Sequence, residues 1–103
     1  MSENFVWETT SKFFEGTAQE VLIRMMKEKR MTRETLAEIV GCDTRTIQRM
    51  RTTGEVGVDT TLAVCLALEL PFFMAVSLAS KYGVLDKPSQ AQHFLTNYPN
   101  NVN

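Results

Sequence analysis

Gly41 constrains the fold more than any other residue of this 103-residue chain. It stands in a short connection between two amphipathic segments, residues 32–40 and residues 44–52. Because a side chain resists the left-handed conformation that so sharp a turn requires, a glycine here allows the first segment to end as a helix. Asp43 can then cap a second helix. The pattern predicts a helix-turn-helix at about 33–52.

The segments around this motif also have helical spacing, and no segment has the alternation of a strand. Thr17 and Glu20 have the form of a capping box, which predicts a helix at about 18–29. Ala37 falls where the two helices of the motif should approach each other most closely. We therefore expect an all-α fold, a bundle of five or six helices.

The second half of the chain predicts the remaining helices. Asp59 is expected to cap an apolar helix that Pro71 stops. A further helix is expected at about 72–82, where a glycine follows, and a last one should start near Asp86 or Ser89. These helices would bury the apolar face of the motif.

The length and an apolar content of 44% suit one compact domain. We assign residues 17–97 to the helix-turn-helix domain. Residues 1–16 form an N-terminal arm whose aromatic residues have neither helical nor strand spacing, and residues 98–103 form a polar tail. A second domain has no room.

The charge of the chain is distributed unevenly. The net charge is −1, but residues 24–51 hold eight Lys or Arg against four Asp or Glu, a net charge of +4. Screening in cells acts over about 8 Å, so a phosphate that touches this segment is little affected by distant acids. An acidic total is therefore compatible with a basic, DNA-binding face.

Catalytic and metal sites have no support in the sequence. Cys42 and Cys65 lack the CxxC spacing, and the lone His93 offers no zinc-ligand pattern. No nucleophile–base arrangement and no phosphate-binding glycine loop is present. We expect no metal, no cofactor and no enzyme activity, and we interpret both cysteines as free thiols. Cys42 would be a redox switch only if it were exposed and its pKa lowered.

The longest apolar run, residues 62–79, contains Glu69 and Pro71, so it is not a typical membrane span. A signal peptide would show a basic start followed by an apolar segment, and we find no such pattern here. These features predict a cytoplasmic protein.

The stretch MTRETLAEIVGCDTRTIQRM, residues 31–50, together with DTTLAVCLALELP at 59–71, resembles the Cro and lambda-repressor-like, or XRE-type, helix-turn-helix family. The Leu-Ala pair, the turn glycine, the isoleucine and the later leucine-rich helix of this family occur here in order. The resemblance covers about residues 17–83. It implies a sequence-specific DNA-binding domain of a bacterial or phage transcriptional regulator, with double-stranded DNA as its partner.

The resemblance also places the residues that contact DNA. The third helix enters the major groove in such folds, and its exposed positions are here Thr44, Arg45, Gln48 and Arg49. Arg can form a bidentate contact with guanine and Gln one with adenine. Arg33 replaces the glutamine that commonly opens the second helix, which suggests a phosphate contact there. Arg51 is another departure, because the family usually has Glu at this position.

Other interpretations of the same residues stay open. Arginines on a helix often form only a solvated face, in weak surface pairs with acids such as Asp43 or Glu38. The turn spacing and the uneven charge favour DNA contact. The alternative is a protein-interaction, oligomerisation or antitoxin-like module that retains the helix-turn-helix fold without DNA recognition. The salt dependence of binding would distinguish these functions.

The helix expected at 72–82 carries more apolar groups than one face of a small domain readily hides. Such an excess often marks an interface, so a homodimer through Phe72, Phe73 and Val76 is one hypothesis. The other is that the N-terminal arm and the last helix cover this surface within a monomer. A dimer would match a palindrome whose half-sites lie about 34 Å apart.

Overall fold

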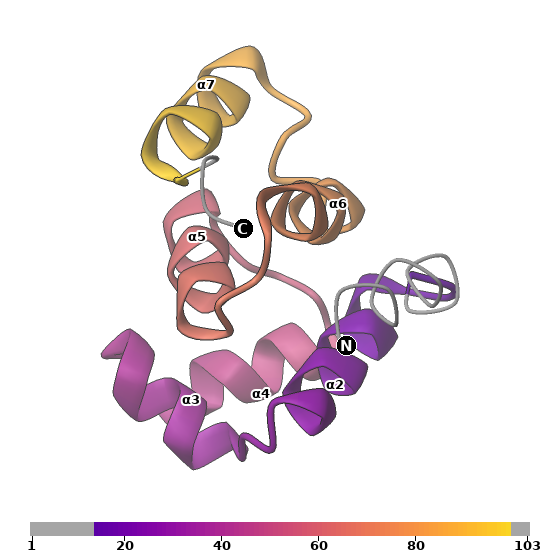
Figure 1. The fold of residues 1–103 in the computed structure, drawn as a ribbon, viewed down its shortest axis with the longest axis vertical. Helices are drawn as coiled ribbons and strands as arrows, with labels where there is room; N and C mark the ends of the chain where they lie inside the picture. Colours follow the sequence, from indigo (N-terminus) through magenta and orange to yellow (C-terminus); the bar gives the residue numbers. More distant parts are fainter. Residues whose placement is uncertain (1–13, 100–103) are drawn as a thin grey trace.

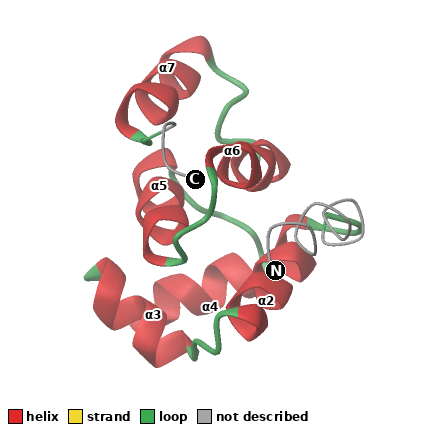
Figure 2. Ribbon diagram, in the orientation of Figure 1, coloured by secondary structure: helices red, strands yellow, loops and turns green. Residues whose placement is uncertain are grey.

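The computed structural model describes residues 14–99, and this part of the chain is all-α. The described residues form six helices and no strand. Figure 1 and Figure 2 show how loops join these helices. The helices are α2 (Ala18–Glu28), α3 (Arg33–Val40), α4 (Thr44–Thr52), α5 (Val58–Ala67), α6 (Phe72–Lys81) and α7 (Pro88–Asn97). The predicted fold class is confirmed. Most of the predicted N-terminal arm, residues 1–13, lies outside the described residues.

The helices form two groups, which lie one above the other in Figure 1. Helices α2, α3 and α4 form the lower group, and α5, α6 and α7 form the upper group. Contacts of α3 with α5 and of α2 with α6 join the two groups. One continuous core runs through both, and its fully buried side chains include Leu22, Leu36, Ile47, Met50, Val64, Leu78 and Phe94.

The helix ends of the lower group form as the local sequence predicts. The Thr17 hydroxyl accepts the Glu20 backbone N–H at 3.2 Å, and the Glu20 carboxylate accepts the Thr17 N–H at 3.0 Å, so the capping box is present. Thr32 caps α3 by accepting the Thr35 N–H at 3.1 Å. Gly41 has φ of +84°, the left-handed conformation that ends α3. The helix-turn-helix therefore spans α3 and α4.

The predicted start of α5 is wrong. Gly57, rather than Asp59, is the N-cap, and Asp59 lies inside the first turn of the helix. The Asp59 carboxylate is 2.6 Å from Nε2 of His93 on α7, so it joins two helices instead of capping one. The helix also ends before Pro71, because Glu69 turns the chain with φ of +55°.

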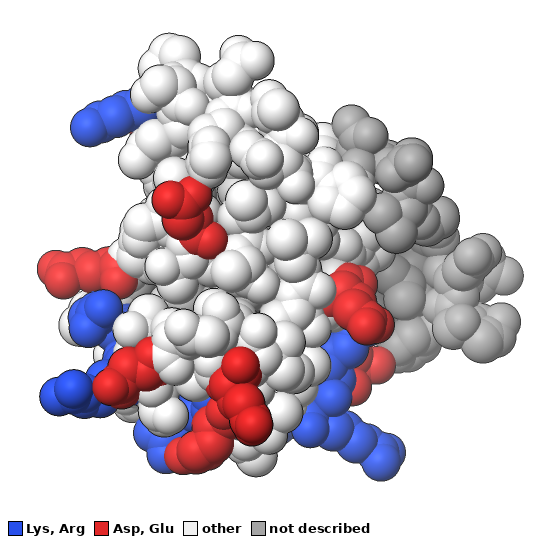
Figure 3. Space-filling model, turned by 90° about the vertical axis from the view of Figure 1, so that its left-hand side faces the viewer, with Lys and Arg blue, Asp and Glu red and all other residues white. Residues whose placement is uncertain are grey.

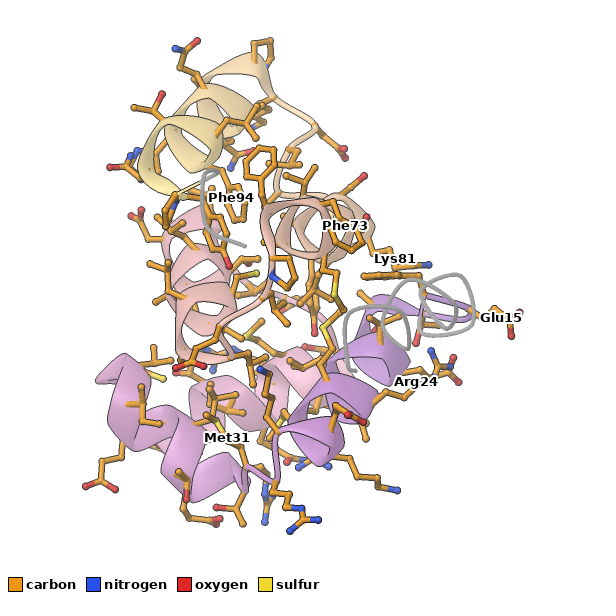
Figure 4. The ribbon with its side chains drawn as sticks, in the orientation of Figure 1. Glu15, Arg24, Met31, Phe73, Lys81 and Phe94 are labelled. Atoms are coloured by element: carbon orange, nitrogen blue, oxygen red, sulfur yellow. The ribbon has the colours of Figure 1, made fainter. Side chains whose placement is uncertain are left out.

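The last helix begins at Pro88, between the two predicted starts. Tyr98, the residue that follows this helix, belongs to the core. We expected Tyr98 in the polar tail, but it is only 3% exposed. Its ring stacks on Phe94, with 5.8 Å between the ring centroids, and its hydroxyl donates to the Leu70 and Cys65 carbonyls. Figure 4 shows Phe94 pointing from α7 toward α5 and α6. This aromatic pair holds α7 on the domain.

No helix in the described part of the chain combines the length and the apolar character that crossing a membrane requires.

Candidate nucleic-acid interface

Helix α4 is fixed at its start by the turn and along one side by the core. The Asp43 carboxylate accepts the Arg45 backbone N–H at 2.8 Å, which satisfies one of the free donors at the helix N-terminus. Ile47 and Met50 are both fully buried. The opposite side of α4 is therefore left at the surface.

Two side chains from distant helices fix the other end of α4. Tyr82 is the residue that follows α6, and its hydroxyl donates to the Met50 carbonyl at 2.8 Å. Gln19 Nε2 on α2 donates to the Thr52 carbonyl at 3.1 Å. Burial raises the pKa of the Tyr82 phenol, so the group keeps the proton it donates. Since carbonyls at a helix C-terminus lack partners within the helix, these bonds hold α4 rigidly against both groups of helices.

The surface side of α4 carries the residues that the sequence singled out. Arg45 and Arg49 are exposed, while Thr44 and Gln48 are half-buried beside them. Thr52, which was not singled out, is exposed on the same side one turn beyond Gln48. Its position i+4 from Gln48 is the signal that could have identified it. The structure thus brings four predicted residues onto one face of one helix.

Arg45 projects into solvent with only a loose ionic contact. Its side chain is 88% exposed, and its Nε lies 3.4 Å from the Asp43 carboxylate. The backbone N–H of Arg45, with its guanidinium, holds the pKa of Asp43 below its usual value. Because surface ion pairs between solvated groups are weak, this contact leaves the guanidinium free to turn toward another acceptor.

Arg33 forms the most definite polar contact between the two helices of the motif. Its Nη1 donates to Oε1 of Gln48 at 2.7 Å, and its Nη2 is 3.9 Å from the Glu34 carboxylate. A guanidinium has only donors, so the oxygen of the Gln48 amide must face it. The NH₂ group of that amide is then directed away from Arg33. The residue predicted to bind a phosphate is thus already bonded to a residue predicted to contact a base.

Charged side chains gather around this motif. Figure 3 shows that Lys, Arg, Asp and Glu lie mostly over the lower part of one face, while its upper part is mostly neutral. Both signs are present there, so the face is not uniformly basic.

The cysteine in the turn lacks the property that a redox switch needs. Cys42 is half-buried, and its burial together with the nearby Asp43 raises the pKa of its thiol. A raised pKa lowers the thiolate fraction and therefore the reactivity. Burial also raises the pKa of the Cys65 thiol to about 12. Within the described residues, no cluster of three or more His, Cys, Asp or Glu could hold a metal ion.

A comparison with protein-family models places this geometry among known domains. The model of the Cro/C1-type HTH DNA-binding domain matches residues 21–72, about half of the chain. The matched segment begins within α2 and extends to the first residue of α6, so it contains the whole helix-turn-helix. Neither the curated proteins nor the solved structures gave a match to the chain.

Proposed function

Because the chain belongs to the family of Cro/C1-type helix-turn-helix DNA-binding domains, we propose that it acts on DNA as a sequence-specific transcriptional regulator of a bacterium or phage. In this proposal α4 enters the major groove of a duplex, and the protein works in the cytoplasm, where the DNA is. A B-DNA major groove is about 12 Å wide and admits one α-helix.

The observation that carries the proposal is the way α4 is mounted. Its inner side is buried, both of its ends are bonded to other elements, and its outer side carries Arg45 and Arg49 at the surface. A helix fixed in this manner can enter a groove without losing backbone freedom on binding. Preorganisation of this kind raises affinity because little order has to be created at the moment of contact.

We assign a role to each exposed side chain of α4. Arg45 is proposed to form a bidentate contact with guanine O6 and N7, since its guanidinium is solvated and near the helix N-terminus. Thr44 and Arg49 would contact a phosphate or, for Thr44, a thymine methyl group. Gln48 would offer the NH₂ group of its amide to an acceptor on a base edge. Arg33 is proposed to position that amide through the 2.7 Å bond.

The test is selection of bound sequences from a random duplex pool. The wild-type domain should enrich a defined sequence, and a variant with Arg45, Gln48 and Arg49 all replaced by alanine should not. Circular dichroism of both proteins checks that the variant is folded. A folded wild-type protein that enriches nothing would contradict the proposal and favour the protein-interaction or antitoxin-like alternative.

A homodimer through α6 remains a proposal of its own. Phe72, Phe73 and Val76 are each only half-buried, so apolar surface is left on α6. Part of the helix is nevertheless covered within one chain, because the Phe72 ring lies 6.3 Å from that of Tyr98. Sedimentation at high protein concentration tests the dimer, and a species that stays monomeric would dismiss it. Val76→Lys should weaken any dimer that uses this face.

A further inference from the structure

Asp43 contacts Arg45 through both the backbone and the side chain of the arginine. Its Oδ1 accepts the backbone N–H of Arg45 at 2.8 Å, and it also accepts Nε–H of the same residue at 3.4 Å. The other carboxylate oxygen, Oδ2, accepts Nη2–H of Arg45 at 3.4 Å. The carboxylate is therefore paired with one edge of the guanidinium, the edge that Nε and Nη2 form.

This pairing leaves the other donors of the guanidinium for a second partner. A guanidinium carries its N–H donors in a planar fork, and the carboxylate uses only those on the Nε side. The tip of the fork, where Nη1 and Nη2 each direct one N–H outward, is not used by Asp43. Two parallel donors of this kind match O6 and N7 of guanine. Arg45 can thus bind Asp43 and a guanine at the same time.

The turn, and not Arg45, fixes the position of the carboxylate. Asp43 is the N-cap of α4, and its bond to the backbone N–H is much shorter than its contacts with the guanidinium. A fixed acceptor beside a long side chain favours some of its directions over others, so less order has to be created on binding. The pair is weak in water, but a duplex that displaces the water strengthens the attraction between the two charges.

The carboxylate also influences which kind of acceptor Arg45 suits. A guanidinium whose charge is balanced by a neighbouring carboxylate attracts a phosphate less, and the carboxylate itself repels a phosphate brought to the same place. Guanine O6 and N7 carry no net charge, so they meet no such repulsion. The pair of Asp43 and Arg45 therefore favours a base edge over the DNA backbone.

We propose that Asp43 is a positioning residue for DNA recognition, which holds Arg45 by its Nε edge, presents the tip of the guanidinium to guanine and disfavours phosphate. The inference deepens the proposed function and rests on it, because it adds a residue that determines specificity to the guanine contact assigned to Arg45. It is separate from the role of Asp43 as a helix cap, since the cap requires only one oxygen.

The first experiment uses Asp43→Asn, because Asn caps helices as well as Asp does. Discrimination between the selected duplex and one with the contacted guanine replaced should fall about threefold to tenfold. Binding to unrelated duplexes should become stronger, and the slope of log affinity against log salt concentration should be steeper by about one, because the guanidinium can then bind a phosphate. A lost cap alone would weaken binding to all duplexes alike.

Two controls separate positioning from general charge. Glu38→Gln removes an exposed acid from α3 and should raise the affinity for all duplexes without changing base preference. In an Arg45→Ala background, Asp43→Asn should change discrimination at the guanine position no further. If Asp43→Asn keeps the discrimination of the wild type, or lowers it equally without Arg45, the positioning role is overturned. Circular dichroism of each variant checks the fold.

The second experiment requires no DNA. The heteronuclear NOE of the Arg45 Nε–H signal measures how ordered this side chain is, and it should be higher in the wild type than in Asp43→Asn. An Arg45 side chain that is equally mobile in both proteins overturns the inference, whatever sequence the wild type selects. A wild-type protein that selects no sequence overturns the proposed function, and the NOE still decides whether Asp43 orders Arg45.

Discussion

Different interactions join the helices within the two groups, the lower group from α2 to α4 and the upper group from α5 to α7. In the lower group, polar side chains bridge helices, as in the bond from Arg33 to Gln48 and that from Gln19 to the Thr52 carbonyl. In the upper group, Asp59 and His93 also bridge two helices, but apolar burial dominates, and Tyr98 is tied to backbone carbonyls. The charged side chains in Figure 3 follow the same division.

This difference separates two tasks, orienting side chains and holding helices in place. Polar bonds are directional, so they fix where an amide or guanidinium points. Apolar burial is not directional, and it supplies most of the free energy that holds a helix in place. We therefore expect changes in the upper group to alter the stability of the domain, and changes on the surface of the lower group to alter its DNA recognition.

The largest expected effect is in the upper group. Phe94→Ala removes a fully buried ring that packs on Tyr98 and should lower the free energy of unfolding by about 3 to 5 kcal/mol. Urea unfolding measures this change. The base preference should stay that of the wild type under conditions where the variant is folded. An altered preference would show that support and recognition are not separate.

The second largest effect is expected on duplex binding, from a change on the surface of the lower group. Arg45→Ala should weaken binding to the selected duplex by about 1 to 3 kcal/mol and relax the choice of base at one position. Because the side chain is 88% exposed, the unfolding free energy should hardly change. Binding assays on the selected duplex and on its single-base variants measure both quantities. A uniform loss on all duplexes would assign Arg45 to a phosphate instead.

A third prediction tests the connection between the two groups. Tyr82→Phe removes the donor to the Met50 carbonyl and should cost about 1 kcal/mol of stability. Because this bond anchors the end of α4, hydrogen exchange in the last turn of that helix should become faster. If exchange changes only in α6, Tyr82 does not anchor α4.

A fourth prediction concerns the bond between Arg33 and Gln48. In a double-mutant cycle with both residues changed to alanine, the two effects on duplex binding should be coupled by about 0.5 to 1 kcal/mol. Arg33→Ala should also alter preference at the same base pair as Gln48→Ala. Additive effects, with equal weakening on every sequence, would instead support the simple phosphate contact that the sequence suggested for Arg33.

The smallest effect is the acid sensitivity of the turn. Since the pKa of Asp43 is lowered by folding from 3.8, its ionised form stabilises the folded state above that pH. This contribution is lost as the pH falls through the lower, folded pKa. Asp43→Asn keeps an oxygen that can cap α4 but does not titrate, so the stability difference from the wild type should shrink as the pH falls below 3.8. A difference that is constant throughout the acid range would exclude this role.

Much of the lower group could be predicted because its signals are local. The capping box at Thr17, the cap at Thr32 and the turn at Gly41 each depend on groups only a few residues apart. The start of α5 was missed because Asp59 finds a partner in His93, 34 residues away, and a side chain with a distant partner is not available as a cap.

The sequence by itself determined where the motif lies, that the fold is helical and which residues on α4 lie opposite the core, because hydrogen bonds within a helix and its turns join near neighbours. Only the tertiary structure decided that Arg33 bonds to Gln48, that Tyr98 is buried and that Asp59 of α5 meets His93 of α7. These facts depend on how helices distant in sequence pack, and packing sets which polar groups come within bonding distance and which lose water.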